Sequence, residues 1–552
     1  MKTRIAAVAI LAGVAAWLGA QALSPAKPPA ELMPAGALFY LEARNFSKLV
    51  SDWDTSPEKK TWLDSENYES FLRSHLMVRL TETRKSFTEA AGLTEDAPLL
   101  TGVAGGESAL AFYHIGKLEF LCITQISSAR FASSALGKVK QKFEARKAGN
   151  RDYFVQSKGE NTIAFALVDD RLMLATREDL IAGALKLLAG EQIASLRQEP
   201  WFDQALAKAP AGIPDVRLIS DLDRTTKTHQ FRSYWVHRNT AEVRQFASMV
   251  ADLKFDSSGI HEDRVFLRRD AQEGLAAAEP VVADLLRYVA PEAGFYQAIA
   301  KPNSGEVKLL ISEKVFGHSR TLTRQYRNNS APGSADGPST GGEDDYETRV
   351  DAPQVDEAFV DAFAPLEALA KNTDAILQTG VTHSAGVLPN IDSVIVLHGA
   401  SPWQSADVRR ALGQVAGAIW SSAPGSLDWT DRNQLNSVTP LRFVIEGNAL
   451  VISASPDFMT RTMAARRTSP PPGATYAASF RYAQELHNFD RMMRLMDFPA
   501  IPQGLQRDAH EPLFFSENMT SFAATLSRLD TVSITAHDTG AMVTESVSYR
   551  KK

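Results

Sequence analysis

Two twelve-residue stretches, far apart in this chain, share nearly the same order of apolar and polar residues. One reads DRLMLATREDLI and begins at Asp170, and the other reads NALVISASPDFM and begins at Asn448. Each joins a short apolar run to a segment with the marks of a helix start, namely a hydroxyl residue followed by acidic side chains. An internal repeat of this kind constrains the fold more than any single motif, because it indicates one structural unit built twice.

The match extends upstream of both stretches. Residues 118–125 and 394–401 are short apolar runs that predict strands. After each run, apolar residues recur at i, i+3, i+4, i+7 and i+11, with the two series 276 residues apart, which predicts the buried stripe of an amphipathic helix. The series are Ala132, Ala135, Leu136, Val139 and Phe143 in the first copy and Val408, Ala411, Leu412, Val415 and Ile419 in the second.

Each copy also predicts a β-hairpin. Residues 162–168 and 440–446 are apolar runs, each followed by a polar pair, Asp169-Asp170 in one copy and Gly447-Asn448 in the other. Pairs of this type favour tight hairpin turns, since Gly and Asn tolerate a positive φ. The runs LMLAT and LVISA then return as the second strands.

A helix is predicted to follow each hairpin. Thr176 and Ser455 stand where an N-cap belongs, and Pro456 occupies the first helical position of the second copy. Each copy is therefore predicted to contain a strand, a helix, a hairpin and a helix in that order.

These patterns predict an α+β fold of two homologous tandem modules, each an antiparallel sheet with helices packed on one face. The modules are expected at residues 30–275 and 285–552, with the boundary within residues 270–285. Residues 328–353 are rich in Gly, Ser, Pro and acidic residues, so we expect a disordered loop there in the second module.

The N-terminus predicts export. Lys2 and Arg4 precede an uncharged run from Ile5 to Leu23, and Ala20-Gln21-Ala22 offers a small-x-small cleavage site. Residues 1–22 are expected to be a signal peptide or an uncleaved N-terminal anchor, with cleavage favoured because Ala and Gly dilute the hydrophobicity of the run. In both cases the body is placed outside the cytoplasm, in the periplasm or beyond.

Composition narrows the functional classes. The formal net charge of −6 argues against a broad nucleic-acid surface, which needs a strongly basic face. The single cysteine, Cys122, rules out an internal disulfide framework and a cysteine-based metal cage. Cys122 aligns with His398 on an apolar strand, so we expect a buried and unreactive thiol.

Two further segments predict helices that have no counterpart in the other copy. Residues 67–92 are amphipathic and mixed in charge. Residues 230–253 combine aromatic and arginine side chains, which is compatible with a nucleic-acid or lipid-headgroup surface, or with a helix whose apolar face is buried and whose basic face is solvated. We favour the second interpretation.

Candidate catalytic and metal-binding residues are few. Ser108 lies in GGESAL, where Leu110 replaces the second glycine of a nucleophile elbow. His261-Glu262-Asp263 is the densest cluster of possible metal ligands, but on a strand only His261 and Asp263 would share a face.

Two acidic stretches complete the set of candidates. Asp221 and Asp223 could place two carboxylates on one strand face, as acid–base pairs or Ca²⁺ sites require. Glu343-Asp344-Asp345 lies in the predicted loop, where acidic residues promote solubility. For all four candidates we favour a structural role, and we predict no metal, no cofactor and no assignable catalytic residue.

The leader, the Pro-x-x-x-x-Phe/Tyr strand openings, and the hairpins ending in LMLAT and LVISAS resemble an uncharacterised group of bacterial envelope proteins. These are catalogued as a domain of unknown function with two α+β modules after a signal or anchor. The resemblance covers most of residues 33–552 and implies an envelope protein with no known chemistry.

The leading functional hypothesis is an exported, non-enzymatic binding or scaffolding protein of the cell envelope. Its partner would be an envelope protein, a glycan or a lipid, and not a nucleic acid. The alternatives are an extracytoplasmic hydrolase, with a site in one module or in the cleft between them, and a carrier of a lipid or other hydrophobic ligand. Residues matched between the copies are apolar or turn-forming rather than reactive, which favours binding over catalysis.

Overall fold

The computed structural model describes residues 27–65, 68, 71–72, 75–94, 102–159, 161–228, 243–317, 362–384, 389–420, 428–435, 439–488 and 527–552. The predicted leader at 1–22, the loop at 328–353 and its acidic residues Glu343–Asp345 lie outside these residues. The chain divides into two compact units, one formed by Met1–Val50 with Thr83–Gln204 and the other by Ser51–Glu82 with Ala205–Lys552.

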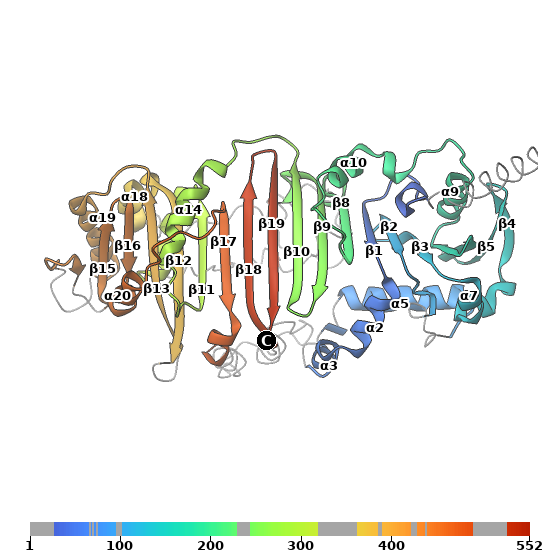
Figure 1. Cartoon of the computed structure of the whole chain (residues 1–552), viewed down its shortest axis with the longest axis horizontal. Coiled ribbons are helices and arrows are strands. Elements are labelled where there is room, and N and C mark those ends of the chain that lie inside the picture. Colours follow the sequence, from blue (N-terminus) through green and yellow to red (C-terminus); the bar gives the residue numbers. More distant parts are fainter. Residues whose placement is uncertain are drawn as a thin grey trace, which may run out of the picture. The chain divides into compact units, whose positions relative to one another are not determined.

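The first unit is built on an antiparallel sheet in which each strand pairs with its neighbour in the order β1-β2-β3-β7-β6-β5-β4 (Figure 1). The strands are β1 (Phe39–Ala43), β2 (Ser108–His114), β3 (Glu119–Gln125), β4 (Glu144–Ala148), β5 (Arg151–Lys158), β6 (Asn161–Val168) and β7 (Arg171–Ala175).

Helices cover both faces of this sheet. Phe165 and Leu172 pack in one core cluster with residues of α5 (His75–Ala90), α7 (Ser128–Ser133) and α8 (Ala135–Val139). The alternate residues of β6, among them Ala164, point to the opposite face, where α9 (Glu178–Leu188) contacts β6 and β7.

The second unit contains a longer antiparallel sheet. Its strands pair in the order β8-β9-β10-β19-β18-β17-β11-β12-β13-β16-β15-β14 (Figure 1). They are β8 (Val216–Asp221), β9 (Phe246–Asp256), β10 (Gly259–Arg268), β11 (Phe295–Ala300), β12 (Thr373–Ser384), β13 (Pro389–Gly399), β14 (Gln434–Leu435), β15 (Leu441–Glu446), β16 (Ala449–Ser453), β17 (Tyr476–Arg481), β18 (Leu529–Asp538) and β19 (Met542–Lys551).

Two separate cores flank the β11–β16 part of this sheet. Ile395 and Leu397 of β13 pack with helices α15 (Ser304–Lys314), α18 (Glu367–Asn372) and α19 (Ser405–Ile419). Val394 and Val396 pack on the other face with α14 (Glu279–Leu285) and α20 (Pro456–Ala464).

The fold is therefore α+β with a large antiparallel sheet, as predicted. The prediction that helices cover one face is wrong. Strands such as β13 and β6 are apolar at consecutive positions rather than at alternate ones, and that pattern buries both faces.

Most of the elements predicted from the repeat are present. The strands at 118–125 and 394–401 correspond to β3 and β13, and both hairpins form with two-residue turns. Asp169 and Asp170 have φ values of 52° and 56°, and Gly447 has a φ of 57°, as the turn residues indicate. Four residues of the predicted stripe of α19 are buried, and the fifth, Ile419, is half-buried and packs against the same core.

Three local predictions are wrong. The helix containing Ala132–Phe143 is interrupted at Ser134, and Ala132 is exposed. Thr176 does not cap α9, because its hydroxyl instead accepts from Phe120 N at 3.0 Å and donates to Leu118 O at 3.2 Å.

The third wrong prediction is the helix across residues 230–253. Residues 229–242 lie outside the described part, but Phe246–Asp256 is the strand β9. Phe246 and Met249, which have helical spacing, are half-buried, whereas Ser248, Val250 and Asp252 at every second position are buried, as on a strand.

Candidate functional site

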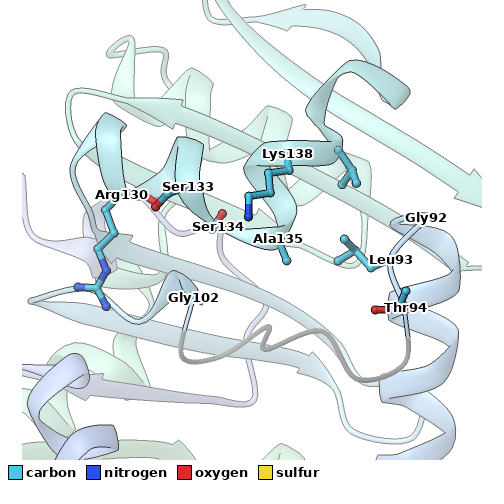
Figure 2. Close-up of a pocket in the computed structure, with 10 residues that line it drawn as sticks. Gly92, Leu93, Thr94, Gly102, Arg130, Ser133, Ser134, Ala135 and Lys138 are labelled. Carbon is cyan, nitrogen blue, oxygen red and sulfur yellow. The ribbon is translucent and has the colours of Figure 1, made fainter.

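The first unit contains a pocket of about 560 Å³ beside the interrupted helix α7–α8. Figure 2 shows Arg130, Ser133, Ser134 and Lys138 in a row along this helix pair, with Leu93 and Thr94 on the opposite side. The lining residues are Gly92, Leu93, Thr94, Gly102, Arg130, Ser133, Ser134, Ala135, Lys138 and Val139.

Serine side chains create the break that shapes this wall. Ser134 ends α7 and caps α8: its hydroxyl donates to Phe131 O at 2.7 Å and accepts from Gly137 N at 3.1 Å. Gly137 fits tightly, since a Cβ at this position would lie 2.1 Å from Phe131 O. The break thus depends on a serine cap and a glycine without a side chain, and it presents Arg130 and Lys138 on separate short helices.

Two basic side chains line the pocket without a described carboxylate partner. Arg130 and Lys138 are exposed, and within the described part of the chain neither forms an ion pair with a carboxylate. Since no lining residue is acidic, the described wall of the pocket is positively charged.

Nearby basic side chains have other contacts. The Lys140 ammonium lies 4.2 Å from the centroid of the Phe154 ring, and Lys142 Nζ donates to Gly92 O at 3.3 Å. Arg146 donates to both carboxylate oxygens of Glu178 at 2.7 and 2.6 Å. None of these three side chains lines the pocket, so Arg130 and Lys138 are the basic residues of its described wall.

The pocket also has an apolar side. Leu93 and Val139 are half-buried and pack against the core cluster of this unit, and Ala135 is a further apolar residue of the lining. Ser133 Oγ donates to Arg130 O at 2.8 Å, which leaves its lone pairs free to accept. The arrangement suits a small ligand with one acidic group and an apolar part.

A Ser–His–Asp combination occurs in the second unit, in the turn between β9 and β10. Ser258 Oγ lies 3.1 Å from His261 Nε2, and Asp256 Oδ2 lies 3.4 Å from the same nitrogen. A catalytic triad needs the serine and the carboxylate on different ring nitrogens. Here the Ser258 hydroxyl donates to Asp256 Oδ1 at 2.6 Å, so the group is a polar turn.

The charge of Asp256 supports this structural interpretation. Its Oδ1 also accepts from Ser258 N at 2.7 Å and from Gly259 N at 3.1 Å. These hydrogen bonds, led by that from the Ser258 hydroxyl, lower the pKa of Asp256 below its ordinary value. A carboxylate held ionised by its own turn stabilises the hairpin rather than a histidinium.

Glu262 and Asp263, the other two residues of the predicted metal cluster, each bind a different side chain. Glu262 binds the Arg264 guanidinium at 2.7 and 2.6 Å, and Asp263 Oδ1 accepts from Ser546 Oγ at 2.7 Å. Across the described residues, no group of three His, Cys, Asp or Glu side chains is arranged to hold a metal ion.

The predicted carboxylate pair does not share a strand face. Asp221 ends β8 and caps the next helical turn, accepting from Arg224 N at 2.9 Å and from Arg224 Nε at 2.5 Å. Asp223 lies within that turn and pairs with Arg269 and Lys227. Each carboxylate is engaged with basic residues, and the two do not converge.

Ser108 and Cys122 have structural surroundings. Ser108 is buried, and its hydroxyl bonds Thr124 Oγ1 at 2.6 Å and Gly106 O at 3.1 Å, so no described base contacts it. Burial raises the pKa of the Cys122 thiol to about 12, as expected for an unreactive cysteine. His398, its counterpart on β13, lies 2.6 Å from Asp374 Oδ1.

No motif in the sequence singles out Arg130 or Lys138 as a binding residue. The signal present was the run Gly137–Lys142, which reads GKVKQK and places three lysines at every second position beside a serine-rich segment. That run shows basic character, but the sequence does not indicate which lysine lines a pocket. Only the fold shows that Lys138 lines a pocket together with Leu93 and Gly102.

Comparisons with known proteins do not identify the chain. No family model matches it, and no curated protein matches it. The solved structure titled "Structure of crystal form I of TP0453" is 10% identical, with a TM-score of 0.24, over 47% of this chain and 85% of that one. A TM-score this low supports no argument about function. Among the helices described, none has the length and apolar character to cross a membrane.

Proposed function

We propose that the protein is an exported, non-enzymatic binding protein of the bacterial envelope, and that the pocket of the first unit holds the acidic group of its ligand. The observation that carries the proposal is the pair Arg130 and Lys138. Both line the pocket, both are exposed, and the described lining contains no carboxylate. Export and the envelope setting rest on the leader at residues 1–22 and on the resemblance of the repeat.

The chemistry of the two cations supports binding. Arginine remains protonated at any physiological pH and presents a planar fork of donors that fits carboxylate and phosphate oxygens. Lysine adds a compact charge on a flexible stem. Arg130 and Lys138 lie on separate helices, so they can approach an anion from different sides.

The size and polarity of the pocket narrow the ligand class. A volume of about 560 Å³ is within the range of small-molecule sites. The apolar side formed by Leu93, Ala135 and Val139 would contact the uncharged part of the ligand. An acidic lipid headgroup with its glycerol, or an acidic sugar of an envelope glycan, has this combination.

The test is a binding titration of the full protein with short-chain phosphatidylglycerol, glycerol phosphate and glucuronate as probes. Replacing Lys138 by Gln is expected to weaken binding of at least one probe about tenfold or more, because a hydrogen bond to a charged group contributes about 1.5–3 kcal/mol. Arg130→Gln is expected to act in the same direction.

Lys147→Gln is the matched control. Lys147 is in the same unit, is 79% exposed, lies 3.7 Å from Asp152 and does not line the pocket. The proposal fails if none of the probes binds, or if Lys147→Gln weakens binding as much as Lys138→Gln does.

We further propose that two parts of the chain, β1–β10 and β11–β19, descend from one duplicated module. The order β1-β2-β3-β7-β6 of the first unit has a counterpart in β11-β12-β13-β16-β15 of the second, where β16, like β7, pairs with the third strand of its series. In both, a two-residue hairpin precedes a helix, α9 or α20. An experimental structure in which these strands fail to superpose in this order would contradict the duplication.

A further inference from the structure

Within the second unit, a strand from the middle of the sequence, β10, pairs with the last strand of the chain, β19, and we call this pair the seam (Figure 1). Both strands have ten residues, Gly259–Arg268 and Met542–Lys551. Each is the second strand of a tight hairpin, since β9 turns directly into β10 and β18 into β19. The two sides of the seam are thus built alike.

The register of the seam is symmetric. Asp263, the fifth residue of β10, lies opposite Ser546, the fifth residue of β19. At one end Arg268 N donates to Ala541 O at 3.0 Å, and at the other end Lys551 N donates to Ser258 O at 2.9 Å. In both bonds the tenth residue of one strand donates to the residue just before the other strand.

The symmetry continues outward from the seam. In the sheet, β9 and then β8 lie next to β10 on one side of the seam, and β18 and then β17 lie next to β19 on the other side. The outer strands β8 and β17 have six residues each. Equivalent elements placed antiparallel about one point form an isologous interface, the arrangement found in two-fold symmetric dimers.

The side chains of the seam show partial self-complementarity. Both strands have glutamate at the fourth position, Glu262 and Glu545, and Arg264 at the sixth position of β10 binds Glu545 at 2.8 Å. If β10 paired with a second β10 in this register, Arg264 of each copy would face Glu262 of the other. Only Asp263 would meet its own like charge.

We propose that this seam is an isologous subunit interface carried within a single chain, so that β10, once released from β19, fits a second copy of itself. The partner surface is β10 of another molecule of the same protein. Ser546 in place of a second aspartate at the fifth position favours pairing within the chain. The inference rests on the proposed duplication and is independent of the pocket.

The register provides a test with full-length protein. Hydrogen-bonded and non-hydrogen-bonded positions alternate along an antiparallel pair. Arg268 and Ala541 form a hydrogen-bonded position, so Asp263 and Ser546, five positions along, form a non-hydrogen-bonded one, where the Cα atoms are closer. A thiol introduced by Asp263→Cys in a Cys122→Ser background would therefore meet its own counterpart in a second molecule. The protein, at high protein concentration, is partly unfolded in urea. It is then returned to buffer and oxidised with glutathione disulfide.

His261→Cys is the matched control. His261 and Asp263 have similarly exposed side chains, 37% and 34%, on the same strand face. The third position faces the seventh, so its thiol would not meet itself. Disulfide-linked dimers are expected several-fold more often with Asp263→Cys than with His261→Cys, and equal yields would overturn the proposal.

A double variant checks the register directly. Asp263→Cys combined with Ser546→Cys is expected to close a disulfide within the folded monomer. Failure to close would overturn the proposal at its first step, and neither result depends on ligand binding.

Discussion

The ion pair between Arg268 and Asp538 leads to the sharpest stability prediction. Arg268 Nη1 and Nη2 donate to the two oxygens of Asp538 at 2.5 and 2.8 Å, and Gly540 N donates to Oδ1 at 2.8 Å. The side chains are only 8% and 10% exposed. Since Arg268 ends β10 and Asp538 ends β18, the pair joins the two sides of the seam within the second unit.

Asp538→Asn removes the negative charge and places an amide where a carboxylate oxygen accepted. Removing one partner of a buried ion pair costs about 3–5 kcal/mol. Arg268 keeps the Gly540 carbonyl at 3.3 Å and the Phe246 ring at 5.7 Å. We therefore expect the low end of that range, a loss of about 3 kcal/mol in the free energy of unfolding at pH 7.

The same substitution should show a defined pH dependence. Burial alone would raise the pKa of Asp538, but hydrogen bonds from Arg268 and Gly540 N outweigh it and hold the pKa below its ordinary value. A lowered folded-state pKa stabilises the protein above the unfolded value of about 4, and this contribution disappears as the pH falls through the folded value. The difference between wild type and Asp538→Asn should therefore shrink below about pH 4.

Urea unfolding followed by tryptophan fluorescence, repeated from pH 7 to pH 3, measures both effects. Asp152→Asn is the control, because Asp152 is 62% exposed and its pair with Lys147 should contribute almost nothing. A loss smaller than about 1 kcal/mol at pH 7, or a difference that stays constant down to pH 3, would refute the reasoning.

Two further predictions test the packing of single residues. Gly294→Ala is expected to destabilise the second unit strongly, because its Cβ would lie 1.5 Å from Glu485 Oε1, and Glu485 is only 1% exposed where it accepts from Thr382 N; an unchanged melting temperature would contradict this packing. Cys122, with a pKa raised to about 12, is expected to resist iodoacetamide at pH 8 in the folded protein and to react normally in guanidinium chloride; fast labelling of the folded protein would show that the thiol is accessible and ionised.

Local patterns predicted those parts of the fold that depend on neighbouring residues. The stripe of α19 and the hairpin turns at Asp169-Asp170 and Gly447 form as predicted. A helix stripe and a two-residue turn each depend on a few consecutive side chains, so the periodicity contains the information. The same local logic was wrong for Phe246–Asp256, whose apolar spacing fits both a helix and the strand that forms.

The sequence alone thus predicted an α+β chain with repeated strand, hairpin and helix signals, and it contained no recognisable catalytic motif. Only the tertiary structure decided that helices cover both faces of the sheets, that Lys138 faces Leu93 across a pocket, and that β10 pairs with β19. The physical reason is distance along the chain. Residues 45 or 283 positions apart meet only through long-range packing, and no local spacing records which partner each side chain will find.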